Sequence, residues 1–313
     1  MLKDYIRNPY RVFMLLGDRG LLNWLSDEPF LRLIYRANIG QKLNLENPQT
    51  FCEKMNWLKL YGHPQQYTLY SDKLGVRAHV AERLGEEYLV PLLGVWNDPD
   101  EIDFRALPER FVLKATHDSG SAYFCRDRAA FDQDAARKKL KRALRTPYYM
   151  KGRERQYEHV VPRVIAEAYL DSGTDALAAD YKVYCFGGEA RFVHLATDRG
   201  TGRHMKITIF DTQWNRLPFW IDGYPTEPGE LPEPKGLNEM IRCAEKLCAG
   251  MPFMRVDFYE VAGRVYFGEM SWLPSGGLIP FQPPAWERRL GDWVTLPPKD
   301  KVDGPGSAPA RIE

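Results

Sequence analysis

Cysteine is scarce in the sequence, and its few members form no recognisable arrangement. Five occur among 313 residues, at Cys52, Cys125, Cys185, Cys243 and Cys248, with no CxxC pair. An odd, scattered set argues against a disulfide framework and against a cysteine-rich zinc site. Reduced thiols are typical of the cytoplasm, so we expect a cytoplasmic protein.

Long apolar runs and an excess of one charge are also missing. The 43 basic and 42 acidic residues leave a net charge of +1, so composition predicts no attraction to nucleic acid. The first twenty residues hold one short apolar patch with charges on both sides, which fits neither a signal peptide nor a transmembrane segment. Two apolar clusters at helical spacing, Val12–Leu16 and Leu21–Leu25, either pack on the body of the protein or associate weakly with the inner face of the membrane.

The composition that remains is that of a globular chain. Hydrophobic residues make up 44% of it and charged residues 27%, and its length is enough for two or three subdomains with sizeable cores. No internal repeat is present, and no GxxxxGK[ST] motif occurs, which excludes a Walker A phosphate loop.

The most informative stretch is Met254–Gly277, where two apolar runs flank the turn Val261-Ala262-Gly263. Each run carries one carboxylate, Asp257 and Glu269, and strands opposed across a tight turn bring such positions together. A buried carboxylate pair is costly without a cation, and Mg²⁺ prefers carboxylate and phosphate oxygens. The stretch therefore predicts a metal site for Mg²⁺, with Mn²⁺ as the alternative ion. In the competing interpretation, Arg255 on the same strand face neutralises Asp257.

A second pattern lies at residues 110–126. The apolar strand Arg110–Ala115 ends on Lys114, the loop Thr116–Ser121 is rich in small polar residues, and Ala122–Arg126 is expected to return as a strand. Backbone N–H groups in such a loop can bind phosphate, and a neighbouring lysine supplies charge. The candidate phosphate ligands are Lys114, His117, Ser119, Gly120 and Ser121.

Other elements follow from local signals. Thr50 and Glu53 form a capping box before a helix, and Ser71-Asp72 is expected to cap the next helix, which ends at Gly85. Asp180–Phe186 and Ala190–Ala196 read as a hairpin, Met205–Phe210 as a strand and Leu237–Leu247 as an amphipathic helix.

In this order, the segments resemble a known family. They are NPQTFCEKMNWLKLY, SDKLGVRAHV, FVLKATHDSG, DYKVYCFGG and RVDFYEVAGRVYFGEMSWLPSGG. The series is similar to ATP-grasp carboxylate–amine ligases, and more narrowly to the TupA-like ATP-grasp group associated with bacterial polysaccharide biosynthesis. The resemblance covers roughly residues 45–297.

The resemblance implies an α+β (α/β) ATP-grasp fold, with ATP held between two α+β subdomains. It implies that Lys73 joins the phosphate ligands, that Glu167, Tyr169 and Leu170 contact adenine, and that Asp180 contacts the ribose. It implies catalytic roles for Arg255 and Lys182 beside the transferred phosphoryl group. Ser271 occupies a position where many relatives carry an asparagine metal ligand. For the substrates we expect contacts with Trp272, Ser275, Gly276 and Lys206.

The expected organisation has five parts. These are a helical segment at 1–40, the first part of the ATP-grasp module at 41–105, a central lid subdomain at 106–165, a C-terminal subdomain with the metal site at 166–297, and a disordered tail at 298–313.

The function that the resemblance implies is a Mg·ATP-dependent ligase that forms an amide through an acyl phosphate. Its expected partners are a small-molecule or glycan carboxylate, such as a uronic acid of a capsular or cell-surface polysaccharide, and an amino acid or small amine. One alternative is a nucleotide-sugar glycosyltransferase, although the Asp98-Pro99-Asp100 triplet lies in a proline-containing loop and is no clean DxD metal motif. The other is an ATP-binding scaffold without catalysis.

Overall fold

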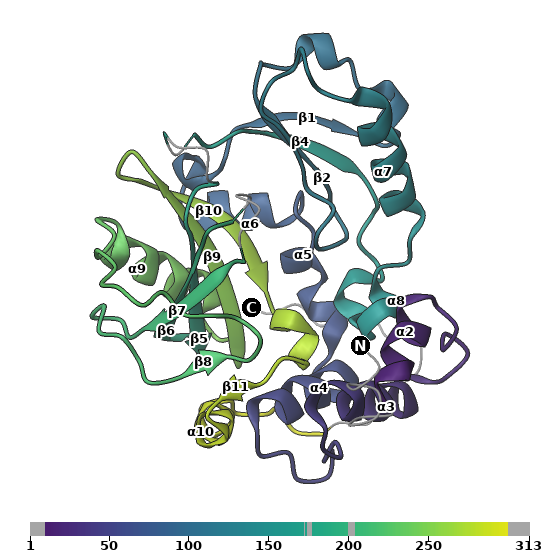
Figure 1. The fold of residues 1–313 in the computed structure, drawn as a ribbon, viewed down its shortest axis with the longest axis vertical. Coiled ribbons are helices and arrows are strands. Elements are labelled where there is room, and N and C mark those ends of the chain that lie inside the picture. Colours follow the sequence, from purple (N-terminus) through teal and green to yellow (C-terminus); the bar gives the residue numbers. More distant parts are fainter. Residues whose placement is uncertain (1–9, 172, 174–176, 200–203, 300–313) are drawn as a thin grey trace.

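The computed structural model describes residues 10–171, 173, 177–199 and 204–299. Helices and antiparallel sheets occupy separate segments, which confirms the α+β class (Figure 1). The helices are α2 (Arg11–Asp18), α3 (Asp27–Ile39), α4 (Phe51–Tyr61), α5 (Thr68–Ser71), α6 (Val76–Arg83), α7 (Gln133–Arg145), α8 (Tyr149–Gly152), α9 (Leu237–Cys248) and α10 (Pro284–Trp293). Short 3₁₀ helices are η1 (Pro64–Tyr67), η2 (Glu86–Tyr88), η3 (Pro99–Glu101), η4 (Phe104–Ala106), η5 (Arg155–Tyr157) and η6 (Pro274–Gly277). The predicted tail at 298–313 lies outside the described residues from 300 onward.

The larger sheet has five antiparallel strands in the order β10-β9-β5-β6-β7. Their bounds are β5 (Asp180–Phe186), β6 (Glu189–Thr197), β7 (Lys206–Phe210), β9 (Phe253–Val261) and β10 (Arg264–Ser271). Helix α9 packs on one face of this sheet through its apolar side (Figure 1). The predicted hairpin at Val261-Ala262-Gly263 is confirmed, and positive φ angles at Ala262 and Gly263 give the tight turn that such strands need.

A bulge in β10 sets the register of that hairpin. Between Phe267 and Glu269 the pairing shifts by one residue, so Glu269 lies directly opposite Asp257. Gly268 occupies the bulge, where an added Cβ would lie 3.0 Å from the Asp257 carbonyl oxygen. The close approach of the two backbones therefore favours glycine here. The bulge turns both carboxylates toward one face of the sheet.

The smaller sheet has the order β1-β4-β2-β3. Its strands are β1 (Leu92–Trp96), β2 (Phe111–Ala115), β3 (Tyr123–Cys125) and β4 (Val164–Ala168). Alternation along β2 sends Phe111 and Leu113 into a core shared with α7, whereas Val112 and Lys114 face the other way. This core is separate from the main one, and β4 spans the predicted boundary between residues 165 and 166.

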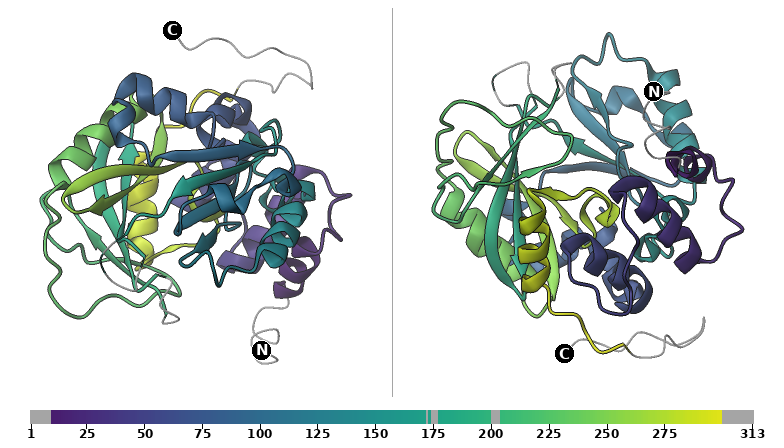
Figure 2. Two further views of the ribbon diagram at one scale, coloured as in Figure 1. Left: turned by 90° about the horizontal axis from the view of Figure 1, so that it is seen from above. Right: turned by 60° about the horizontal axis from the view of Figure 1, so that its bottom comes forward.

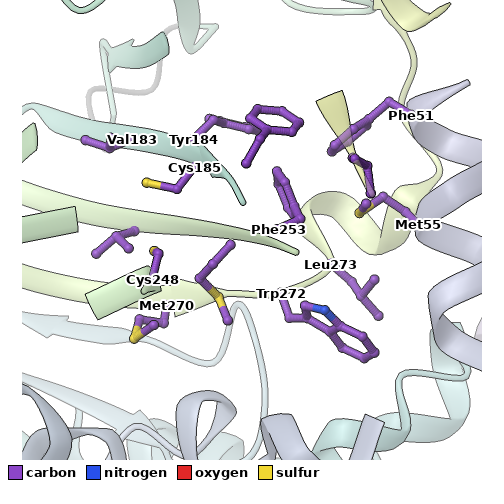
Figure 3. Close-up of a cluster of buried hydrophobic side chains, with 14 of the residues drawn as sticks. Phe51, Met55, Val183, Tyr184, Cys185, Cys248, Phe253, Met270, Trp272 and Leu273 are labelled. Carbon is purple, nitrogen blue, oxygen red and sulfur yellow. The ribbon is translucent and has the colours of Figure 1, made fainter. Parts of the chain in front are cut away.

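The main core joins both halves of the sequence. Phe51 of α4 packs edge-on against Phe253 and Phe281, with ring centroids 5.1 and 5.6 Å apart, as part of the cluster in Figure 3. The predicted capping box at the start of α4 is confirmed, with Thr50 and Glu53 each bonding the other's backbone N–H. Helices α2 and α3 pack together at the end of the molecule away from the five-stranded sheet (Figures 1 and 2).

One predicted helix begins later than expected. Helix α5 ends at Ser71 and α6 starts at Val76, because the Asp72 carboxylate accepts a hydrogen bond from Leu74 N and closes a turn between them. The turn holds Lys73, whose backbone N–H donates to the Thr116 carbonyl oxygen 3.1 Å away. This contact ties the segment to the loop after β2.

All five cysteines are free and buried, as their spacing predicts. The described residues include no helix long and apolar enough to cross a membrane. A small strand pair, β8 (Trp220–Ile221) with β11 (Phe281–Gln282), completes the fold.

Gly291 in α10 tests how tightly the N-terminal and C-terminal halves pack. An added Cβ there would lie 2.1 Å from the Gln49 carbonyl oxygen, so Gly291→Ala should lower the unfolding free energy by about 1–3 kcal/mol, although alanine favours helices. Gly229→Ala is the control, because nothing lies within 4 Å of the added Cβ. Chemical denaturation of both variants measures the difference, and a stabilised Gly291→Ala would contradict the packing.

Candidate functional site

A cavity of about 620 Å³ lies between the two sheets. The small sheet contributes side chains from β2 and β4, and the large sheet contributes side chains from β5, β9 and β10. Thirteen of the sequence-predicted site residues line it: Lys73, Lys114, Ser119, Gly120, Ser121, Glu167, Tyr169, Leu170, Asp180, Lys182, Arg255, Asp257 and Glu269.

On the small sheet, Glu167 holds two cations. Its carboxylate lies 2.6 Å from Lys114 Nζ and 2.8 Å from an Arg77 guanidinium nitrogen, and the residue is 8% exposed. Burial lowers the pKa of Lys114, but the Glu167 carboxylate and other neighbouring groups outweigh this effect and bring it to about 12. Lys114 is therefore a permanently charged group on the cavity wall.

The loop Thr116–Ser121 is held by its own side chains. Ser121 Oγ donates to Asp118 Oδ1 at 2.6 Å and accepts a hydrogen bond from Ala115 N at 3.0 Å. Lys73 Nζ donates to the Asp118 carbonyl oxygen, and burial lowers its pKa. Ser119 and Gly120 remain exposed at the tip, and Gly120 has a φ of +89° with open space beside it. The tip thus presents backbone toward the cavity without side-chain obstruction.

On the large sheet, cross-strand pairing produces a row of charged side chains, two carboxylates followed by a lysine. Glu269, Asp257 and Lys182 are direct neighbours on β10, β9 and β5. Lys182 Nζ bridges Asp257 and Asp180, lying 2.6 Å from Asp180 Oδ2, which also receives Arg199 at 3.0 Å. Asp180 Oδ1 is buried and has no hydrogen-bond partner among the described residues.

Arg255 is the second cation on Asp257. It donates to both carboxylate oxygens, at 2.6 and 2.8 Å, and to Ser271 Oγ at 2.9 Å. Burial raises the pKa of Asp257, but the opposite effect of Arg255 and Lys182 is larger, so the pKa falls to about 2. The interpretation in which Arg255 neutralises its strand neighbour therefore describes this geometry.

Glu269 differs from its neighbours because it has no ion pair among the described residues. Its nearest polar contact is Ser271 Oγ, which donates to Glu269 Oε1 at 3.3 Å. No group of three or more His, Cys, Asp or Glu side chains in the described ranges has metal-site geometry. Mg²⁺ is commonly held by one or two carboxylates together with phosphate oxygens, so Glu269 with Asp257 fits that ion when a phosphate completes the shell.

Apolar side chains also line the cavity. Val90, Val112, Leu170, Met205 and Phe267 line it. Such a wall suits a flat ring, while the neighbouring backbone of β4 offers hydrogen-bonding groups. Tyr169 stacks under Arg110, whose guanidinium lies 4.2 Å from the ring centroid, so its side chain is held in place beside the cavity.

Three residues expected to contact a ligand are absent from the cavity lining. Trp272 is 2% exposed and stacks on Tyr67 with ring centroids 4.0 Å apart, so it belongs to the core and offers no face to a sugar (Figure 3). Lys206 is paired with Glu227 at 2.8 Å and with Asp198 at 3.4 Å, and Asp198 itself lines the cavity. His117 is 4% exposed and is not one of the lining residues.

Ser271, Ser275 and Gly276 lie outside the cavity lining. Ser271 stands behind it, between Arg255 and Glu269, and Ser275 and Gly276 form the η6 turn after β10. Arg77, Arg199 and Tyr259 line the cavity without having been predicted. Each depends on contacts between distant segments, so no local motif in the sequence marks them.

A family model described as TupA-like ATPgrasp matches residues 53–295, which is most of the chain. No curated protein matches the chain.

Solved structures similar to the chain share little sequence with it. D-alanine–D-alanine ligase from Bacillus anthracis, complexed with ATP, matches 72% of this chain and 63% of that one, with 13% identity and a TM-score of 0.40. An ADP complex of N5-carboxyaminoimidazole ribonucleotide synthetase matches 79% and 57%, with 13% identity and a TM-score of 0.43. L-amino acid ligase from Bacillus licheniformis matches 84% and 55%, with 14% identity and a TM-score of 0.41. The chain thus spans less than two thirds of the length of each.

Asp257→Asn tests the charge row. It leaves Arg255 and Lys182 without their shared counter-charge, so the unfolding free energy at neutral pH should fall by about 3–5 kcal/mol. In the folded protein the pKa of Asp257 lies below the ordinary value of an aspartate. The stability that this carboxylate contributes is therefore present above about pH 4 and is lost as the pH falls through about 2. The gap between wild type and variant should therefore narrow on acidification.

Denaturant titrations between neutral and acidic pH measure that gap. Asp103→Asn is the control, since this carboxylate belongs to an exposed pair with Arg105 and should change stability little. An equally small effect of Asp257→Asn would show that the charge row is not assembled.

Proposed function

Because the chain belongs to the TupA-like ATP-grasp family, we propose that it is an ADP-forming carboxylate–amine ligase. Family membership gives it the ATP-grasp fold, and the observation that carries the proposal is the cavity between two antiparallel sheets. Its lining combines apolar side chains with six basic and five acidic ones. A nucleotide likewise combines an apolar base with charged phosphates.

The proposed reaction has two steps. A carboxylate oxygen of the first substrate attacks the γ-phosphorus of ATP, the bond to the β-phosphate oxygen breaks, and ADP leaves. The amine nitrogen of the second substrate then attacks the carbonyl carbon of the acyl phosphate, inorganic phosphate leaves, and the nitrogen loses a proton. Both steps depend on positioning and on neutralising the charge of the phosphates.

The chain's cations are arranged for that task. We assign the phosphates to Lys114, Lys73 and the backbone of Ser119–Ser121, because a fixed positive charge stands beside an open loop tip there. Lys182 and Arg255 lie on the opposite wall, where they hold Asp257 in the resting state and are within the same cavity as the loop. We propose that they stabilise the transferred phosphoryl group.

The cavity lining is close to charge balance, so the protein alone does not neutralise a triphosphate. We propose Glu269 and Asp257 as ligands of Mg²⁺, with Mn²⁺ as an alternative and Ser271 orienting Glu269. When bound, the ion would offset the negative charge of the phosphates.

The nucleoside end follows from the remaining residues. We propose that adenine lies against Val112, Leu170 and Met205, and that the unpaired Asp180 Oδ1 accepts hydrogen bonds from the ribose hydroxyl groups. Glu167 and Tyr169 would contact the base mainly through the backbone of β4, because their side chains are occupied by Lys114 and Arg110.

For the carboxylate we propose a uronic acid of a capsular or cell-surface polysaccharide or its precursor, and for the amine an amino acid or small amine. The association of this family with polysaccharide biosynthesis supports the first choice. We further propose that residues 106–165 act as a lid, that 41–105 and 166–297 form the rest of the module, and that the protein works in the cytoplasm, where ATP is available.

The central experiment measures ADP release with paired substrates. Purified protein with ATP and Mg²⁺ should release ADP and phosphate only when a uronic acid and an amine are both present, and mass spectrometry should show their condensed product. Consumption of a nucleotide sugar without use of ATP would overturn the ligase in favour of a glycosyltransferase. Tight ATP binding with no turnover on any pair would favour a scaffold.

Glu269→Gln tests the carboxylate without an ion pair. It should lower kcat by about 10²–10³-fold, because the charge that holds the cation is removed, yet leave the melting temperature nearly unchanged. Glu260→Gln on the same hairpin is the control, since Glu260 bonds Gly236 N away from the cavity and should leave kcat intact. Loss of folding in Glu269→Gln would make this residue structural.

A further inference from the structure

Beside the η6 turn, a buried lysine and a glutamate face each other without forming an ion pair. Lys59 of α4 is 2% exposed, and Glu154 precedes η5. An added Cβ on Gly276 would lie 3.6 Å from Lys59 Nζ and 3.5 Å from Glu154 Oε1, so both groups border this glycine. Burial lowers the pKa of Lys59 to about 8 and raises the pKa of Glu154.

Further polar atoms around this pair are unsatisfied. Lys59 Nζ has one hydrogen-bond acceptor among the described residues, the Gly152 carbonyl oxygen at 2.9 Å, although an ammonium group can donate three hydrogen bonds. Asn56 Oδ1 and Gln156 Oε1 are buried and have no partner among the described residues. Buried polar groups in native proteins are normally hydrogen-bonded, so a cluster of free ones points to a ligand site.

The cluster adjoins the reacting end of the proposed ligase cavity. Besides burial, two opposite charges shift the pKa of Glu154: Lys59 lowers it, and the Glu269 carboxylate raises it. In η5, the pKa of Tyr157 is raised by burial and by Glu269 and lowered by Arg255. Tyr148 has a hydrogen bond with Ser119 in the phosphate loop. Glu154 is therefore close enough to both Lys59 and the Glu269 carboxylate of the cavity for each to shift its pKa.

The turn itself leaves an approach to the pair. Ser275 is exposed, Gly276 and Glu154 are half-buried, and Ser275 and Gly276 both have positive φ angles. A side chain on Gly276 would contact both charged groups, whereas glycine keeps the space between them open. Two desolvated charges of opposite sign, held apart, are costly unless a group of matching charge contacts each one.

We propose that Lys59, Glu154 and the Ser275-Gly276 turn bind the amine co-substrate, and that this co-substrate is an α-amino acid. The α-carboxylate lies on the Lys59 ammonium, and the α-amino group lies on the Glu154 carboxylate, which is the side nearer Glu269. A zwitterion pairs with the buried Lys59 ammonium and the half-buried Glu154 carboxylate at once, which a simple amine does not. This inference rests on the proposed ligase function and narrows its second substrate.

The first test is direct binding. Each of the twenty protein amino acids, and the primary amine that remains when its α-carboxylate is removed, is titrated into the full-length chain by calorimetry, with thermal shift as a second readout. At least one amino acid should bind at least tenfold more tightly than its matched amine. If no amino acid is preferred over its amine, the site is overturned.

Two variants separate recognition from structure. Lys59→Met should weaken binding of the preferred amino acid at least tenfold and leave binding of its matched amine unchanged, whereas Glu154→Gln should weaken binding of both. Lys54→Met is the control, because Lys54 lies on the same helix and bonds the Val294 carbonyl oxygen, away from η6. Equal weakening of amino acid and amine by Lys59→Met would mean a structural role and overturn the proposal. If Lys59→Met does not fold, the comparison on wild type and Glu154→Gln decides.

ATP binding and ADP release are measured on the same samples. Amino acid binding with the expected variant pattern, but no ADP release with any uronic acid, would leave the site standing and overturn the ligase. ADP release that depends on an amine but shows no preference for an α-carboxylate would overturn the site alone.

Discussion

The cavity depends on the way in which its buried charges neutralise one another. On the large sheet, Asp257 is clamped by Arg255 and Lys182, and Lys182 extends the contact to Asp180. An isolated charge at any of these positions would be costly to bury, so the row is stable only as a whole. The hairpin makes this possible, because the β10 bulge fixes which residues of β9 and β10 lie opposite each other. Glu269 lies at the end of the row and is the carboxylate that has no ion pair among the described residues.

The small sheet repeats the arrangement with fewer groups. Glu167 holds Lys114 and Arg77, so this group has one cation more than it has carboxylates, and the wall facing the charge row presents positive charge. A phosphate chain entering between the sheets would meet Lys114 on one side and the Arg255–Lys182 pair on the other. This is why the proposed phosphate site needs both sheets.

Local signals in the sequence predicted the parts of the site that local structure determines. The Thr50–Glu53 capping box, the hairpin at Ala262-Gly263 and the loop after Lys114 each depend on residues close in sequence, and the structure contains them. Trp272 was predicted as a substrate contact because it follows Glu269 closely, but stacking on Tyr67 of η1 turns it into the core.

The residues that sequence reasoning missed act across long separations. Arg77 reaches Glu167 of strand β4 from helix α6, and Lys59 comes near Glu154 only because α4 packs beside η6. Nothing in the letters around Lys59 distinguishes it from an ordinary helical lysine. The α+β class and the residues of the proposed nucleotide end were thus accessible from sequence, whereas the proposed amino acid end required the assembled fold.

The separation of the two hydrophobic cores has a consequence for biosynthesis. The core of the four-stranded sheet draws on residues from Leu93 to Ala166, so all of it is available once that part of the chain has left the ribosome. The main core combines residues near Leu22 with residues near Val294 and cannot close until residue 294 has been synthesised. The small sheet can therefore assemble its own core first, while the apolar faces of α3 and α4 wait for their partners. Aggregation thus threatens this protein most between the synthesis of Ala166 and that of Val294.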